Sequence, residues 1–166
     1  MGKITVLAGE NLTTGTGSVL AAFQTAAVGS AASNVYVKRL EISQSGSTTL
    51  AMCRAEFATR NTSGTLTMTS AAPVLVRPIG GAASGFTGNT APAGGVGRSG
   101  INSSADSGGT YTSIYPFNFA NTAGYLWKPA PDEELWVSPS TLFVVRFTTA
   151  PGTTTGWTFA LTLDES

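Results

Sequence analysis

Side chains that could carry out chemistry are few in this sequence, and they lie far apart. The 166 residues include no histidine, and Cys53 is the only cysteine. Histidine is the commonest general base and metal ligand in proteins, and a structural zinc site needs a cluster of cysteines and histidines. The composition therefore excludes Ser-His and Cys-His nucleophile pairs and a zinc site. We expect a protein that is not an enzyme and that binds no cofactor.

Three of the nine carboxylates form a cluster, Asp132-Glu133-Glu134, directly after Pro129-Ala130-Pro131, and the others are scattered. Glycoside hydrolysis needs two carboxylates that face one bond, and calcium needs several oxygen ligands around one point. Three consecutive residues of an extended chain point in different directions and meet neither requirement. The cluster predicts a solvated turn that leads into a strand at Leu135.

One glycine motif matches the dinucleotide-binding pattern G-x-G-x-x-G, from Gly95 to Gly100. That pattern binds phosphates only between a strand and a helix N-terminus, with an acidic residue about 20 positions later. Here Asn102-Ser103-Ser104 follows the motif, and nothing in this segment favours a helix. We interpret the motif as a chance match in a chain with 20 glycines.

Aromatic side chains gather around a proline-rich stretch, at Tyr125, Trp127 and Trp136. Exposed tryptophan and tyrosine rings are typical of sugar-binding surfaces and are enriched in protein interfaces. Packing in the core and rim of a sandwich explains the same residues without any ligand. The sequence leaves all three interpretations open.

The composition of the whole chain favours association with other proteins. Charged residues make up 11% of the sequence, and nine basic and nine acidic residues cancel to a formal net charge of zero. Weak repulsion between copies favours association, although a monomer with a threonine-rich surface is the alternative. The basic residues are scattered, and no apolar run approaches about 20 residues, so we expect neither nucleic-acid nor membrane binding.

The candidate residues have to be positioned by strands, and the clearest strand pattern lies at the C-terminus. Large apolar residues alternate with smaller ones from 157 to 163, which predicts a half-buried strand. Residues 142–147 are apolar on both faces, as in a central strand of a sandwich. Ala150-Pro151-Gly152 separates the two segments, and we predict a hairpin with a long loop.

Shorter apolar segments predict further strands, at 35–42, 66–68, 74–76, 111–119 and 135–137. A change of parity at Lys38-Arg39 predicts a β-bulge, although a strand buried on both faces is the alternative. Tyr111, Tyr115 and the two following phenylalanines share one parity, which predicts one common face. Residues 19–28 and 49–60 fit either a helix or a strand, and we favour strands. Together these segments predict a single all-β domain over residues 1–166, an antiparallel β-sandwich or jelly roll.

Residues 80–109 lack this alternation. Glycine, alanine, serine, asparagine and threonine dominate the segment, and its large apolar residues are Phe86, Val96 and Ile101. These side chains are too few to offset an ordering cost of about 1–2 kcal/mol per residue. We therefore predict an extended Gly/Ala/Ser-rich arm that is ordered against a partner, with Arg98 as its one charged contact.

The C-terminal region contains a Pro-x-Glu-Glu-hydrophobic turn (Pro131–Leu135), a strand with a central arginine (Arg146), a Thr-Ala-Pro turn (Thr149–Pro151) and an acidic terminus (Asp164-Glu165). In these features, over about the last 45 residues, the chain resembles small virion structural proteins of tailed bacteriophages. Similar proteins are capsid decoration or accessory head proteins. The resemblance implies a β-sandwich that attaches to the icosahedral shell of the virion, often as a trimer, and that contacts copies of itself and the major capsid protein.

The sequence therefore predicts a decoration or cement subunit of a phage capsid, found in the virion. Its predicted interface residues are Phe86, Val96, Arg98, Ile101, Tyr125, Trp127 and Trp136. The alternative function is a carbohydrate- or cell-surface-binding module of a fibre or adhesin, for which Tyr125, Trp127 and Trp136 would form the ligand-binding surface.

Overall fold

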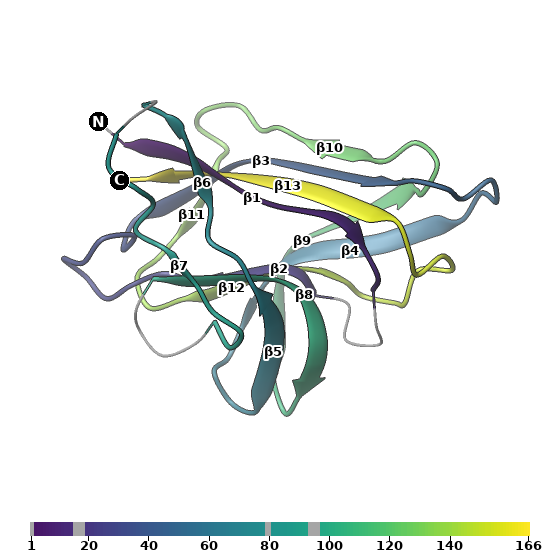
Figure 1. Cartoon of the computed structure of the whole chain (residues 1–166), viewed down its shortest axis with the longest axis horizontal. Helices are drawn as coiled ribbons and strands as arrows, with labels where there is room; N and C mark the ends of the chain where they lie inside the picture. Colours follow the sequence, from purple (N-terminus) through teal and green to yellow (C-terminus); the bar gives the residue numbers. More distant parts are fainter. Residues whose placement is uncertain (1, 15–18, 79–80, 93–96) are drawn as a thin grey trace.

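A computed structural model describes residues 2–14, 19–78, 81–92 and 97–166 (Figure 1). Within these ranges the chain forms strands and no helices. The strands are β1 (Lys3–Leu12), β2 (Val19–Gln24), β3 (Val35–Gln44), β4 (Met52–Arg60), β5 (Thr65–Ser70), β6 (Val74–Arg77), β7 (Thr87–Gly88), β8 (Arg98–Ser107), β9 (Tyr111–Ala120), β10 (Tyr125–Trp127), β11 (Leu135–Val137), β12 (Leu142–Phe147) and β13 (Trp157–Glu165). The all-β prediction is confirmed. The preference for strands over helices in residues 19–28 and 49–60 is confirmed for 19–24 and 52–60, which form β2 and β4.

Two sheets pack against each other, as in a β-sandwich (Figure 1). Sheet A has the order β10-β3-β13-β1-β6, and β11 also pairs with β3. Sheet B has the order β5-β8-β2-β12-β4-β9, and the short β7 pairs with β8. All pairings are antiparallel except that of β7 with β8. The predicted antiparallel sandwich is thus confirmed, while its finer description as a jelly roll stays a prediction.

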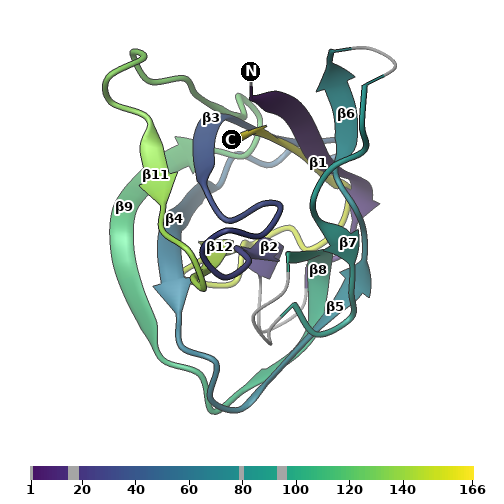
Figure 2. The same ribbon diagram turned by 90° about the vertical axis from the view of Figure 1, so that its left-hand side faces the viewer.

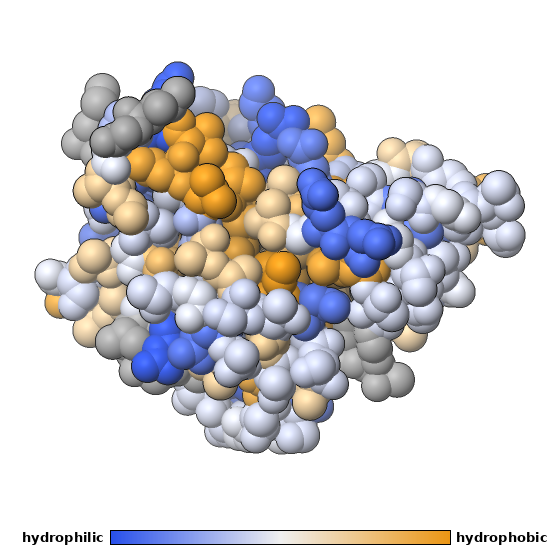
Figure 3. Space-filling model, in the orientation of Figure 1, coloured by the Kyte–Doolittle hydropathy of each residue, from blue (hydrophilic) through white to orange (hydrophobic). Residues whose placement is uncertain are grey.

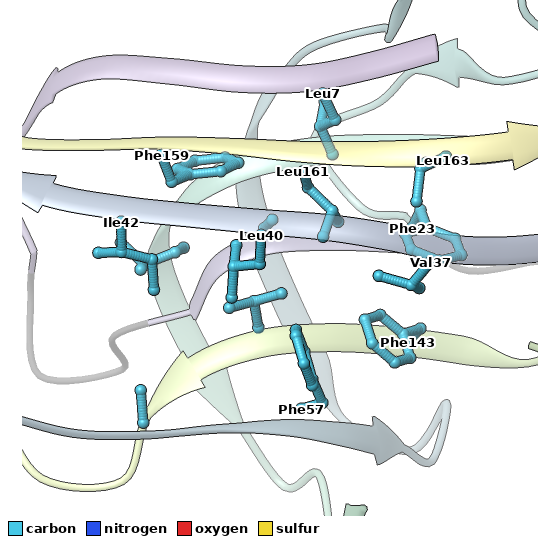
Figure 4. Packing of buried hydrophobic residues seen from close by; sticks show 14 of the residues in the cluster. Leu7, Phe23, Val37, Leu40, Ile42, Phe57, Phe143, Phe159, Leu161 and Leu163 are labelled. Carbon is cyan, nitrogen blue, oxygen red and sulfur yellow. The ribbon is translucent and has the colours of Figure 1, made fainter. Parts of the chain in front are cut away.

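The main core lies between the two sheets. Figure 4 shows Leu161 and Leu163 of β13 pointing from sheet A toward Phe57 and Phe143 of sheet B. Alternate residues of β13 are buried along its whole length, as the period of two predicts. Because β13 lies between β3 and β1, its apolar row occupies the centre of this core.

The predicted hairpin of the last two long strands is wrong. β12 pairs with β2 and β4 in sheet B, whereas β13 pairs with β1 and β3 in sheet A. β12 has a neighbour on both edges and is buried on both faces, so no edge is left for β13. The turn at Ala150-Pro151-Gly152 therefore carries the chain from one sheet to the other.

Bulges change the side-chain parity in two strands. In β3, Val37 pairs with Leu163 and Arg39 pairs with Thr162, which leaves Lys38 as the extra residue of a bulge, as predicted. A second bulge in β9 was not predicted. Tyr115 pairs with Phe57 and Ser113 pairs with Ala58, so Ile114 is the extra residue. The prediction of one common face is therefore wrong for Tyr111, which lies on the opposite face from Phe117.

Sheet B carries a second apolar cluster on its outer face, which we call the outer cluster. Figure 2 shows sheet B curling from β9 and β4 round to β8 and β5, so that its ends partly enclose this face. Tyr111 packs on the rim of the cluster. The buried members of the outer cluster are Val19, Ala22, Ala58, Leu66, Met68, Leu142 and Val144.

The predicted arm at 80–109 is wrong for much of its length. Residues 98–107 form β8, which lies between β5 and β2 in sheet B. Small residues are needed there, because a Cβ on Gly100 would lie 2.7 Å from the Cβ of Met68. Phe86 is 2% exposed and packs edge-to-face on Phe23, with ring centroids 5.3 Å apart. A segment poor in apolar residues is thus ordered by strand pairing within the domain rather than by a partner.

Hydrogen bonds fix the segment before Phe86 as well. The Glu165 carboxylate accepts hydrogen bonds from the Ser84 hydroxyl at 2.6 Å and from the Gly85 backbone N–H at 2.6 Å. The Lys3 ammonium donates to the Ala83 carbonyl at 2.8 Å. Both ends of the chain therefore help to hold residues 83–86 against the domain.

Candidate interaction surfaces

Phe86, Arg98 and Ile101, three of the residues predicted to contact a partner through the arm, contribute little exposed surface. Phe86 belongs to the main core, and Ile101 is half-buried against it. Arg98 is half-buried in β8, opposite Gln24 of β2. Val96 lies outside the described residues. The interface prediction is therefore wrong for Phe86, because its side chain is used inside the domain, and stays a prediction for the other three.

The three aromatic residues near the proline-rich stretch have different environments. Tyr125 stacks on Phe117 with ring centroids 4.1 Å apart, and Trp127 packs edge-to-face on Phe57 at 4.9 Å. Burial, followed by the interaction with the neighbouring hydroxyl of Tyr115, raises the pKa of Tyr125 to about 12. Trp136, in contrast, is 57% exposed. The two rings of β10 therefore close the side of the sandwich, and Trp136 is the one that mainly faces solvent.

The carboxylate cluster forms the predicted turn, and one of its members makes an ion pair. Asp132 and Glu133 are exposed. The Glu134 carboxylate accepts a hydrogen bond from the Lys38 ammonium at 2.5 Å, and Asp164 lies 3.4 Å from the same ammonium. The hydrogen bond to Glu134 is the main reason that the pKa of Lys38 is raised. These contacts hold the 128–134 loop to the bulge of β3, which is a structural role.

A network of charged side chains lies at the outer cluster, and sequence reasoning missed it. The Arg146 guanidinium donates to the Glu56 carboxylate at 2.8 Å, and the Arg60 guanidinium donates to the Asp106 carboxylate at 2.8 Å. The Arg60 side chain is 1% exposed, so its ion pair is buried. The available signal was the charges of one parity in β4, at Arg54, Glu56 and Arg60, and the single charge of the apolar β12, at Arg146.

Tyr111 links the two ion pairs. The guanidinium carbon of Arg146 lies 3.8 Å from the centre of its ring, a cation–π contact, and its hydroxyl donates a hydrogen bond to Asp106. Burial, followed by the contact with Asp106, raises the pKa of Tyr111 to about 12. Each charged group has an opposite partner, so the network is suited to holding strands together rather than to binding a ligand.

An exposed apolar patch lies on β6, at the free edge of sheet A. Val74 is 69% exposed and Val76 is 48% exposed, and Val6 of β1 lies beside Val74 in the sheet. Figure 3 shows an apolar surface at the position of β6. Residues 74–76 were predicted as a strand from the sequence, but their position at an edge depends on which strands pair.

Within the described ranges, no group of three or more histidine, cysteine, aspartate or glutamate residues is placed to hold a metal ion. The same part of the chain has no helix that is long and apolar enough to span a membrane.

Comparisons with family models, with curated proteins and with solved structures gave no match to this chain.

Proposed function

We propose that the chain is a structural subunit of a bacteriophage particle, a decoration or cement protein that acts through contacts with copies of itself and with the major capsid protein. The observation that carries this proposal is the apolar patch at β6. Sheet edges are ordinarily protected by charged residues or by covering segments, because an open edge is a template for another chain. Here the edge exposes Val74 and Val76, with Arg77 as the one charged residue of the strand.

Other features support the same proposal. Only 11% of the residues are charged and the formal net charge is zero, so copies repel one another weakly. The resemblance of the last 45 residues to small virion proteins of tailed phages also favours it. Such a subunit stabilises a shell by burying apolar surface across subunit junctions, which contributes roughly 25 cal/mol for each Å² removed from water.

Mass spectrometry of purified phage particles tests the location. We expect the chain in many copies per particle, and its absence from the particle would contradict the proposal.

Charge substitution tests the surface. We expect the V74K/V76K variant to keep the Tm of the parent chain, because both side chains already face solvent, and to lose self-association in sedimentation velocity and binding to shells that lack the protein. The matched control is Val28→Lys, since Val28 is 84% exposed in the loop between β2 and β3. Equal association of the two variants would exclude the β6 patch as the interface.

A further inference from the structure

Three adjoining hollows form a groove along one side of the sandwich, which we call the side groove. The first hollow lies between β4, β9 and the loop at 138–141, and the other two lie where β9 of sheet B approaches β11 and β10 of sheet A. The first hollow has a volume of about 570 Å³ and shares Thr59, Ser138 and Thr141 with the second, a narrow slot of about 100 Å³. The second shares Leu135 with the third, which has a volume of about 510 Å³. The first and third each have the size of a small-molecule site.

Hydroxyl groups line the first hollow. Thr59 of β4 and Thr112 of β9 are cross-strand neighbours, and the loop at 138–141 faces them. Thr62, Thr110, Thr112 and Ser140 are exposed, and Thr59 is half-buried. This end of the groove therefore presents several hydroxyls that a ligand can reach.

Charge is nearly absent from this lining. Arg60 is the charged residue of the first hollow, but its side chain is 1% exposed and its guanidinium is paired with Asp106. The third hollow has Lys128 and Glu133 on its rim, one of each sign. An anionic or cationic ligand would leave its solvation shell without finding an uncompensated opposite charge, which is unfavourable. The lining therefore favours a neutral, polar ligand.

Apolar and aromatic surface lies next to the hydroxyls. Ile114, which is 44% exposed, and Trp136 line the slot together with Phe143 of the main core. Tyr115, Tyr125 and Trp127 line the third hollow. A ligand that fits both parts has an apolar face and several hydroxyl groups, and a pyranose ring has this combination.

The free edge of β9, beside the groove, is poorly suited to an added peptide strand. The bulge at Ile114 interrupts its regular hydrogen-bonding pattern, and Pro116 has no N–H to donate. Bulges and prolines at a sheet edge oppose strand addition. Recognition in the groove would therefore depend on side chains rather than on backbone pairing, which favours a sugar over an extended peptide.

We propose that the side groove binds a neutral oligosaccharide, a binding activity separate from the shell contacts at β6. The hydroxyls around Thr59 and Thr112 exchange hydrogen bonds with the sugar hydroxyls. The slot at Ile114 and Trp136 takes the apolar face of a neighbouring sugar ring.

An array of neutral and acidic oligosaccharides, probed with the purified chain, tests this proposal. Calorimetric titration with the neutral oligosaccharide that gives the strongest signal then measures the affinity. The test variants are Thr112→Val, which removes a hydroxyl at constant shape, and Trp136→Ala. The matched controls are Thr48→Val and Leu50→Ala. Both residues are exposed in the loop between β3 and β4, far along β4 from Thr59. We expect each test variant to weaken binding about tenfold or more and each control to bind as the parent chain does.

Three results would overturn the proposal: no binding to any neutral oligosaccharide, binding to acidic oligosaccharides alone, or equal affinity of the parent chain and both test variants. We expect all four variants to be folded, because their positions lie outside the main core. Thermal unfolding checks this. Incorporation of the test variants into particles is a separate readout, so a failure of the groove proposal leaves the structural function standing, and the reverse also holds.

Discussion

The main core and the outer cluster lie on opposite faces of sheet B and exclude water in different ways. The main core is made of apolar residues, mainly aliphatic and aromatic, from both sheets. The outer cluster has no second sheet above it, and the ion pairs Glu56–Arg146 and Arg60–Asp106 lie among its apolar residues together with Tyr111. One region is closed by a second sheet, the other by the curl of a single sheet and by paired charges.

The two regions should therefore lose stability in different ways when their residues are substituted. An apolar core loses stability in proportion to the volume removed. A buried polar network is favourable only while every member has its partner, because an unpaired buried charge is costly. We therefore expect graded losses in the main core and an all-or-none response in the outer cluster.

Removal of a central ring should have the largest effect. Phe57 contacts Trp127 at 4.9 Å, Phe117 at 5.5 Å and Phe143 at 5.7 Å, measured between ring centroids. We expect Phe57→Ala to lower the free energy of unfolding by about 3–5 kcal/mol, because it leaves a cavity between the sheets. Urea denaturation measures this change. Phe57→Leu is the control and should lose much less, and equal losses would contradict a close-packed core.

Breaking the buried ion pair should have the second-largest effect. Asp106→Ala leaves the Arg60 guanidinium buried without its carboxylate, and we expect a loss of about 3 kcal/mol in the free energy of unfolding. The double variant R60M/D106L removes both charges and should recover most of that loss. A double variant less stable than Asp106→Ala would show that the pair itself, rather than the avoidance of an unpaired charge, stabilises the cluster.

Alkaline pH should weaken the outer cluster through Tyr111. Its pKa is raised to about 12 in the folded protein, against about 10 for an unfolded chain. Above pH 10 the unfolded chain has lost this proton while the folded protein keeps it, so stability falls as the pH rises from 10 toward 12. Denaturation at pH 9, 10 and 11 measures the slope, which should be shallower in Tyr111→Phe. The Tyr125 phenol, also at about 12, should leave a residual slope in that variant.

Substitution of the exposed tryptophan should have the smallest effect. Trp136 belongs to neither apolar region, and we expect Trp136→Ala to change the free energy of unfolding by no more than about 0.5 kcal/mol. Trp157 is fully buried, and Trp157→Ala should be strongly destabilising. Thermal unfolding of the two variants compares them directly, and a large loss from Trp136→Ala would mean that its ring packs on the domain.

The sequence by itself determined the features that depend on neighbouring residues. The strand at 157–165 and the bulge at Lys38 follow from the alternation of apolar and polar side chains, because successive residues of a strand point to opposite faces. The turn at Asp132–Glu134 follows from the prolines that precede it. The aromatic residues near 125–136 were also found from composition, as candidates for a ligand surface or for the core.

Only the tertiary structure decided which strands pair and which side chains remain exposed. The strand Arg98–Ser107 has almost no apolar signal, since its place between β5 and β2 requires small residues such as Gly100. Arg60 and Asp106 are 46 positions apart in the sequence, and no local pattern relates them. The hydroxyl-lined end of the side groove was equally undetectable, because threonine and serine occur throughout the chain and only the packing of two sheet edges brings a few of them together.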